Sequence, residues 1–329
     1  MKCTALPKIL SICWILVIAA GCRMGAPIHF WDPPQLESTV GQRVALSGVS
    51  GPAELAGGLQ RQLLAQTPSD SGRQMTLVGA AELQRGSEIQ LVSAVDDLPN
   101  DLVVASIARR QGIDYLLRGE VISDRNRSQP ADPTHQTLKV SWSLTGLDAM
   151  HPGGGRPIVV DPKTAVDRYP DLALIGDPAE IMTQAMVRET YRLITPSVSR
   201  DRVQLEIPYL LPGSAAVRRG NLAARGGRWG EAEAIWSDVR ERHPTQIAAL
   251  HNLALAAAAG QDFTRAKQLA RKAIRLQPSS LHKQNMVWIE VKQRAYHEAF
   301  GLPDPPEGWF VTEDDHTTIS PSVPKLHQP

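Results

Sequence analysis

Residues 43–207 alternate between two hydrophobic patterns, one of period two and one of period 3.6. Apolar runs of strand type predict strands at 43–49, 75–78, 113–122, 138–147 and 203–207. In the run 138–147, polar residues alternate with the apolar Leu138, Val140, Trp142 and Leu144. Such alternation is typical of a half-exposed antiparallel strand, so we expect this strand to pair with the one before it.

Helical patterns separate these strands. Leu55, Leu59 and Leu63 recur every four residues and form one apolar stripe. A second helix is expected between Asn100, a suitable N-cap, and Gly112, a suitable left-handed residue after the last turn. The sequence Asp-Pro-Ala-Glu at 177–180 predicts a capped helix that continues to about residue 194. We therefore expect an α+β or α/β domain over residues 43–207.

The C-terminal third repeats itself with a period of 34 residues. The pairs that recur are Gly226 and Gly260, Ala232 and Ala266, and Pro244 and Pro278. This period is that of the tetratricopeptide repeat, a pair of antiparallel helices. We expect an all-α helical-hairpin solenoid over 213–300, with repeats at 213–246 and 247–280 and a capping helix at 281–299. Small residues fall where the two helices of a repeat cross closely, at Gly220, Ala232, Ala254 and Ala266.

The N-terminus carries an export signal. The twelve residues 9–20 are apolar-rich, whereas a membrane-spanning helix needs about 20 residues, so they predict a signal peptide. Ala19-Ala20-Gly21-Cys22 resembles the bacterial lipobox, which implies a signal peptide over 1–21 and an acylated, palmitate-bearing Cys22. Arg23 follows the cysteine where an Asp would favour the inner membrane, so the resemblance implies the periplasmic face of the outer membrane. We expect a tether at 22–42 and a disordered tail at 301–329.

Composition narrows the classes of function. The 329 residues include 35 Lys and Arg against 34 Asp and Glu, so the chain lacks the basic excess of a nucleic-acid binder. Of its three cysteines, Cys3 and Cys13 lie in the predicted signal peptide. The mature chain would keep only Cys22 and could form no intrachain disulfide.

Residues 103–121 combine a helix, a glycine and Asp114-Tyr115 before two leucines and Gly119. This run is similar to an element of the CsgG-like and TolB N-terminal-like periplasmic domains, which pair it with a first strand like 43–49. The resemblance extends from that first strand to Val121 and implies an α/β fold. It implies no single function, because such domains serve as channel subunits, accessory lipoproteins and synthase activators. A channel is disfavoured, since 123–136 and 148–176 are too polar and proline-rich for membrane hairpins.

The helical region carries a second resemblance. Its runs 220–222, 228–229, 234–236 and 251–254 are similar to those of a tetratricopeptide lipoprotein family with no assigned activity.

No sequence motif indicates catalysis or a cofactor. The glycines at 153–155 lack the Lys-Ser/Thr of a phosphate loop, and no His-X-X-X-His or paired-cysteine pattern suggests a metal. Asp96-Asp97 and the acidic run 313–316 are more typical of a solvated turn and a solvated tail. We expect no catalytic residue, metal or cofactor, and a protein that is not an enzyme.

The first helices of tetratricopeptide repeats line a concave groove. Positions 5 and 9 of these helices are here Val217, Asn221, His251, Leu255, Asn285 and Ile289. Such a mixed surface suits a peptide with an apolar anchor and amide hydrogen bonds, from an envelope protein or peptide of unknown identity. We expect a lipid-anchored interaction or assembly module. The alternatives are an accessory lipoprotein that activates a peptidoglycan synthase or secretion system through the α/β domain, and a ligand-binding or enzymatic α/β domain.

Overall fold

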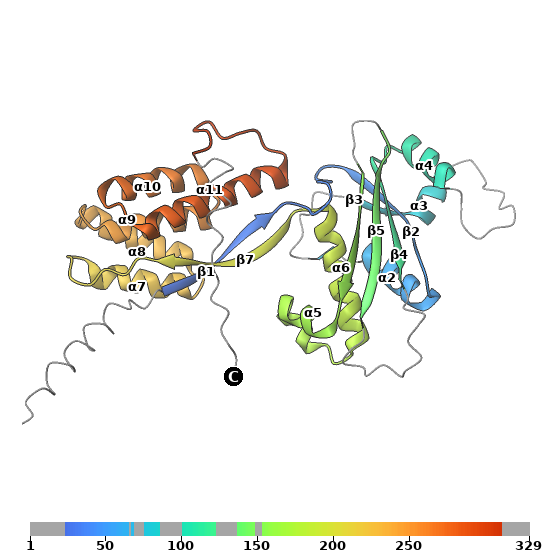
Figure 1. The fold of residues 1–329 in the computed structure, drawn as a ribbon, viewed down its shortest axis with the longest axis horizontal. Coiled ribbons are helices and arrows are strands. Elements are labelled where there is room, and N and C mark those ends of the chain that lie inside the picture. The colour runs from blue at the N-terminus through green and yellow to red at the C-terminus, as the bar shows by residue number, and fades with distance from the viewer. Residues whose placement is uncertain are drawn as a thin grey trace, which may run out of the picture. The chain divides into compact units, whose positions relative to one another are not determined.

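The computed structural model describes residues 24–65, 67–68, 76–85, 101–122, 137–148 and 153–310. Cys22, Asn100, Asp96-Asp97 and the acidic run 313–316 lie outside them. The described residues form a mixed α/β structure with two units (Figure 1). The α/β unit comprises 31–198 and 295–302, and the helical unit comprises 24–30, 199–294 and 303–310.

A five-stranded sheet in the order β3-β2-β4-β5-β6 forms the centre of the α/β unit. Its strands are β2 (Arg43–Ser50), β3 (Thr76–Gly79), β4 (Tyr115–Val121), β5 (Leu138–Gly146) and β6 (Gly154–Val160). β2 is parallel to β3 and β4, while β5 is antiparallel to β4 and β6. The predicted pairing of 138–147 with its predecessor is thus confirmed. Gly119 faces Trp142 in this pairing, and a Cβ at Gly119 would come 2.7 Å from the Trp142 ring, so only glycine leaves room there.

Helices cover both faces of this sheet (Figure 1). One face packs on α2 (Ala53–Ala65), α5 (Pro162–Arg168), a 3-10 turn (Pro170–Leu174) and α6 (Pro178–Ile194). The other packs on α3 (Ala80–Arg85) and α4 (Asp101–Arg110). The predicted cap of α6 is present, since the Asp177 side chain accepts a hydrogen bond from the Ala179 amide. Gly112 after α4 has a φ of +69°, as expected for a left-handed terminus.

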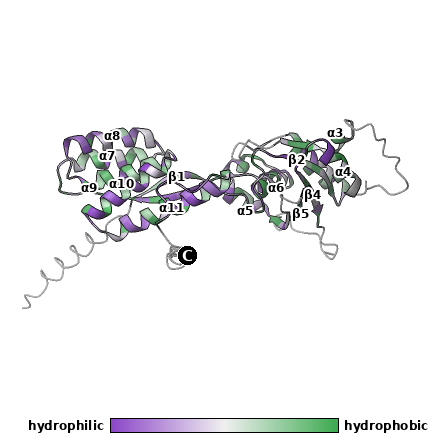
Figure 2. Ribbon diagram, turned by 90° about the horizontal axis from the view of Figure 1, so that it is seen from above, coloured by the Kyte–Doolittle hydropathy of each residue, from purple (hydrophilic) through white to green (hydrophobic). Residues whose placement is uncertain are grey.

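The helical unit consists of five consecutive helices and a two-stranded sheet of β1 (Met24–Asp32) with β7 (Ser197–Leu205). The helices are α7 (Ser214–Arg225), α8 (Trp229–Arg242), α9 (Ile247–Ala259), α10 (Phe263–Leu276) and α11 (Ser280–Phe300). Each of α7 to α9 packs on the helix that follows it. Hydrophobic and hydrophilic residues alternate along helices such as α8 and α10 (Figure 2), whereas α9 is buried from Ala248 to Ala258.

Several elements differ from the sequence-based expectation. Residues 24–32 of the expected tether form β1. Of the expected strand 203–207, residues 203–205 belong to β7, which pairs with β1 rather than with the five-stranded sheet. The segment 153–176 contains β6, α5 and the 3-10 turn, where we predicted no regular element. Residues 301–310, assigned to a disordered tail, carry a Glu307 that is hydrogen bonded to α10 and α11. β1 pairs with the distant β7, whereas β6 pairs with its neighbour β5.

Candidate functional site: the inner face of the helical unit

The six predicted groove residues lie on alternate helices and are all buried. Val217 and Asn221 lie on α7, His251 and Leu255 on α9, and Asn285 and Ile289 on α11. The segment 201–208, which contains the end of β7, forms hydrogen bonds to these same three helices. The expectation of an open groove is therefore corrected, because these six side chains are buried inside the protein's own chain.

Three asparagines bind the backbone of this segment. The Asn221 and Asn252 side-chain amides donate to the Glu206 carbonyl at 2.9 and 3.0 Å. The Asn252 side-chain oxygen accepts from the Glu206 amide at 2.9 Å, and Asn285 donates to the Gln204 carbonyl at 2.9 Å. Both backbone groups of Glu206 are thus satisfied by carboxamides, as buried polar groups require.

His282 on α11 holds the side chain of Glu206. Its Nε2 lies 2.8 Å from Glu206 Oε2, and its Nδ1 lies 2.8 Å from the Gln277 carbonyl. Both partners only accept hydrogen bonds, so both ring nitrogens must carry a proton and His282 is an imidazolium. Burial lowers the pKa of His282, but the hydrogen bonds to Glu206 and Gln277 outweigh burial and raise that pKa above its usual value.

The ring of His251 stacks on that of His282, with centroids 4.4 Å apart, and is neutral. Burial, with the charge of His282, lowers the pKa of His251 to about 3. Its Nε2 lies 2.9 Å from the side-chain nitrogen of Asn285 and accepts that hydrogen bond. The proton of His251 is therefore on Nδ1.

Further contacts hold the rest of the segment. Val203 and Leu205 are buried, Trp288 on α11 donates to the Asp201 carboxylate at 2.9 Å, and Arg218 on α7 donates to the Pro208 carbonyl at 3.1 Å. The segment thus crosses from α11 to α7. Carboxamide hydrogen bonds to a backbone segment are thus present, and this segment is part of the protein's own chain.

A second internal segment, 307–310, binds to α10 and α11. Lys267, almost fully buried, pairs with Glu307 at 2.8 Å and donates to the Gly308 carbonyl at 3.1 Å. Glu290 accepts the Phe310 amide at 2.8 Å. Burial raises the pKa of Glu307, but its hydrogen bonds, above all that from Lys267, lower it to about 2.

Sequence reasoning missed Asn252 and His282. The asparagines at 221, 252 and 285 recur at nearly the period of the helical repeat, and this near-repeat is the signal that could have identified them as one set. No sequence signal connected them to Glu206.

The described residues bring together no group of three or more His, Cys, Asp or Glu side chains that could hold a metal ion. Within the same residues, no helix combines the length and the apolar character that crossing a membrane requires.

No protein-family model matches the sequence, and no curated protein matches it. Among solved structures, the chain is similar to a PelC variant dodecamer from Paraburkholderia phytofirmans, with 12% identity over 52% of this chain and 98% of that chain. The TM-score is 0.28, a likeness too weak to carry an argument about fold or function.

Proposed function

We propose that this protein is a lipid-anchored, non-catalytic interaction module of the cell envelope. The observation that carries the proposal is the set of asparagines on α7, α9 and α11 that binds an extended backbone. Hydrogen bonds from carboxamide side chains to backbone groups are one way in which a protein binds an extended polypeptide. A partner reaches the module either at its exposed surfaces or by replacing segment 201–208.

We further propose that the helical unit is a tetratricopeptide solenoid. Its equivalent helices begin at Ser214 and Ile247, and at Trp229 and Phe263, and both spacings match the repeat period to within one position. A Cβ on Gly220 would lie 2.4 Å from the Trp236 indole nitrogen, so helices α7 and α8 cross closely at this glycine. Ala232, Ala254 and Ala266, the other predicted crossing positions, are fully buried, which is also consistent with this architecture.

The lipid anchor at Cys22 is tested by fractionation of the full-length protein in its native envelope. We expect the Cys22→Ser variant to leave the membrane fraction and to keep the fold of the wild type, because the acyl chains supply the membrane affinity. Membrane retention of that variant, equal to the wild type, would contradict the anchor.

The interaction role is tested by photo-crosslinking from exposed side chains of each unit. Leu210 and Leu222 serve for the helical unit, and Val159 and Leu174 for the α/β unit. We expect one unit to give a discrete protein adduct in the wild type that is absent when Cys22→Ser releases the protein from the membrane. The absence of any such adduct from all four positions would overturn the interaction role.

Binding of a small ligand by the α/β unit is the second candidate function. One observation favours it, a cavity of about 290 Å³ beside β6.

A further inference from the structure

Helix α7 exposes one side along its whole length. The residues of this side recur at the spacing of a single helix face, and all of them are exposed: Ala215, Arg218, Arg219, Leu222 and Arg225. Three of the five are arginines, and Leu222 exposes 56% of its surface. The sequence of α7 contains no acidic residue, so this side of the helix is basic.

The loop before α7 adds large apolar side chains to this exposed side. Tyr209, Leu210 and Leu211 expose 64%, 98% and 52% of their surfaces. Arg218 donates a hydrogen bond to the Pro208 carbonyl at 3.1 Å, which joins the loop to the helix. A cluster of exposed apolar side chains is typical of a surface that contacts a protein or a membrane. We define the α7 face as Tyr209, Leu210, Leu211, Arg218, Arg219, Leu222 and Arg225.

The charge of the α7 face is not balanced by neighbouring acidic residues. Residues 207–230 contain four arginines and no aspartate or glutamate. Helix α8, which packs on α7, carries four acidic residues. Three of these form ion pairs with arginines outside the α7 face: Glu231, Glu233 and Asp238. The Glu206 carboxylate, just before the loop, is bonded to His282. The α7 face therefore carries an excess of positive charge and complements an anionic surface.

Only a short length of chain separates the predicted anchor from the α7 face. β1 begins at Met24, two residues after Cys22, and two residues of chain span at most about 7 Å. The Trp229 indole, at the start of α8, donates to the Pro27 carbonyl of β1 at 2.9 Å. Trp229 follows Arg225, the last residue of α7, by four positions. An anchor at Cys22 therefore holds this end of the helical unit close to the bilayer.

We propose that the α7 face binds the anionic surface of the membrane in which Cys22 is anchored. Its arginines donate hydrogen bonds to lipid phosphates, and its leucines and tyrosine enter the headgroup region, as is typical of proteins that lie on a membrane. This inference rests on the proposed lipid anchor. With the α7 face on the membrane, we expect the protein adduct of the crosslinking experiment to come from the α/β unit.

The first test places a fluorophore on the α7 face of the mature lipoprotein in vesicles of phosphatidylethanolamine and phosphatidylglycerol. Leu222→Cys gives a single reactive thiol, because acylation blocks Cys22. The label is a nitrobenzoxadiazole, whose emission shifts to the blue in an apolar environment. We expect a blue shift and quenching by lipids that carry a nitroxide. Leu174→Cys, on the α/β unit and 91% exposed, is the control, and its label should report water.

Vesicle flotation of the same samples separates the two proposals. If the protein floats and the label at position 222 reports water, the contact of the α7 face is overturned and the anchor stands. If the protein does not float, the anchor is overturned, and the contact with it. A blue shift without nitroxide quenching would mean that a second copy of the chain covers the face. An equal shift at position 174 would mean that the dye itself binds lipid. Either of these two results would overturn the proposal.

The second test reverses the charge of the α7 face. Arg219→Glu with Arg225→Glu should abolish most of the blue shift at position 222, because an anionic surface repels the new carboxylates. Lys272→Glu with Arg275→Glu is the matched control, since both side chains are exposed on α10 of the same unit and the change in charge is equal. An unchanged shift in the α7 variant would overturn the proposal.

A comparison of lipids makes the same test without charge variants. In vesicles of phosphatidylcholine, which carry no net charge, the blue shift at position 222 should be smaller by about twofold or more. An equal shift in the two kinds of vesicle would overturn the proposal.

Discussion

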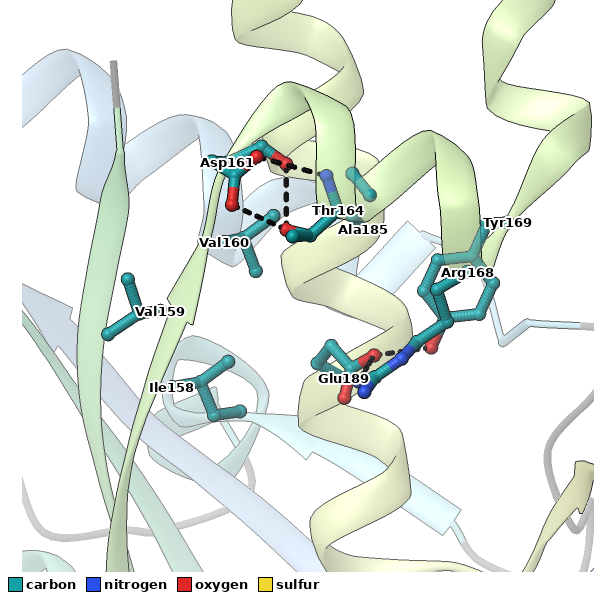
Figure 3. A pocket seen from close by; sticks show the side chains of 10 residues that line it. Ile158, Val159, Val160, Asp161, Thr164, Arg168, Tyr169, Ala185 and Glu189 are labelled. Carbon is teal, nitrogen blue, oxygen red and sulfur yellow. Dashed lines mark hydrogen bonds and ion pairs between the residues drawn. The ribbon is translucent and has the colours of Figure 1, made fainter. Parts of the chain in front are cut away.

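The buried polar side chains of the helical unit and of the α/β unit have different surroundings. In the helical unit, the carboxamides of α7, α9 and α11 form hydrogen bonds to the protein's own segment 201–208. In the α/β unit, the buried Glu189 lines a cavity and accepts hydrogen bonds from Arg168 and from the Tyr169 hydroxyl (Figure 3). The surface that the sequence period predicts as a groove is thus buried by the protein's own chain, while the cavity lies where the sequence shows no repeat.

The largest loss of stability is expected when charged residues replace Asn221 and Leu255, two of the buried residues predicted to line the groove. Asn221 and Leu255 are fully buried, and from an open groove we would expect their joint replacement by Glu to leave stability nearly unchanged. In the filled groove, two unpaired carboxylates would be buried, so we expect Asn221→Glu with Leu255→Glu to destabilise the helical unit by more than about 4 kcal/mol. Urea unfolding followed by circular dichroism measures this. A loss of only a few tenths of a kcal/mol would contradict the burial of these residues and support an open groove.

The next effect concerns the crossing of α7 and α8. Trp236 is fully buried, and its indole nitrogen donates to the Val217 carbonyl at 3.2 Å. We expect Trp236→Ala to cost about 3–5 kcal/mol in the free energy of unfolding. Trp229→Ala, at a half-buried position on the same helix, is the matched control and should cost less. Equal losses in both variants would contradict the packing described here.

A smaller difference in stability is expected between variants of Asn252 and Asn285, because Asn252 forms more hydrogen bonds. Asn252 binds both backbone groups of Glu206 as well as Asn221, whereas Asn285 binds the Gln204 carbonyl and His251. We expect Asn252→Ala to cost more than Asn285→Ala, each loss being about 1–3 kcal/mol, because buried partners are left unsatisfied. The reverse order, measured by the same urea unfolding, would contradict the assignment of Asn252 as the central residue.

A last prediction concerns the dependence of stability on pH, in which the two stacked histidines act with opposite sign. The raised pKa of His282 means that its stabilising contribution is complete below the unfolded value near 6.5 and is lost as the pH rises through the folded pKa. The lowered pKa of His251, about 3, means that stability is lost as the pH falls below about 6.5, because only the unfolded state takes up the proton.

We therefore expect this pair to give maximum stability near pH 6.5. Replacing His282 by Gln should flatten the alkaline side of the profile, while the loss of stability on the acid side should remain, because burial is the main cause of the lowered pKa of His251. A profile whose alkaline side is unchanged in this variant would contradict the imidazolium assignment.

Helices and strands whose hydrophobic pattern or capping residues lie within the element itself could be predicted from the sequence. The helices of the C-terminal third, the cap at Asp177 and the alternating strand 138–147 follow from neighbouring residues alone. β1 and β7 could not be paired in advance, because nearly the whole α/β unit lies between them in the chain and proline interrupts the alternation of Ala26, Ile28 and Phe30. The predicted groove residues lie on helices that contact segment 201–208, and this contact could not be predicted, since nothing local connects Glu206 with Asn221, Asn252 or His282.

The most direct test of the filled groove is amide hydrogen exchange of Glu206 in the full-length protein at near-neutral pH. This amide donates to the Asn252 side chain, and we expect it to exchange as slowly as the amides of the buried helix α9. In Asn252→Ala, exchange at Glu206 should become faster while α9 stays protected. Exchange of Glu206 in the wild type at the rate of a free extended chain would contradict the account and leave the groove open to a partner.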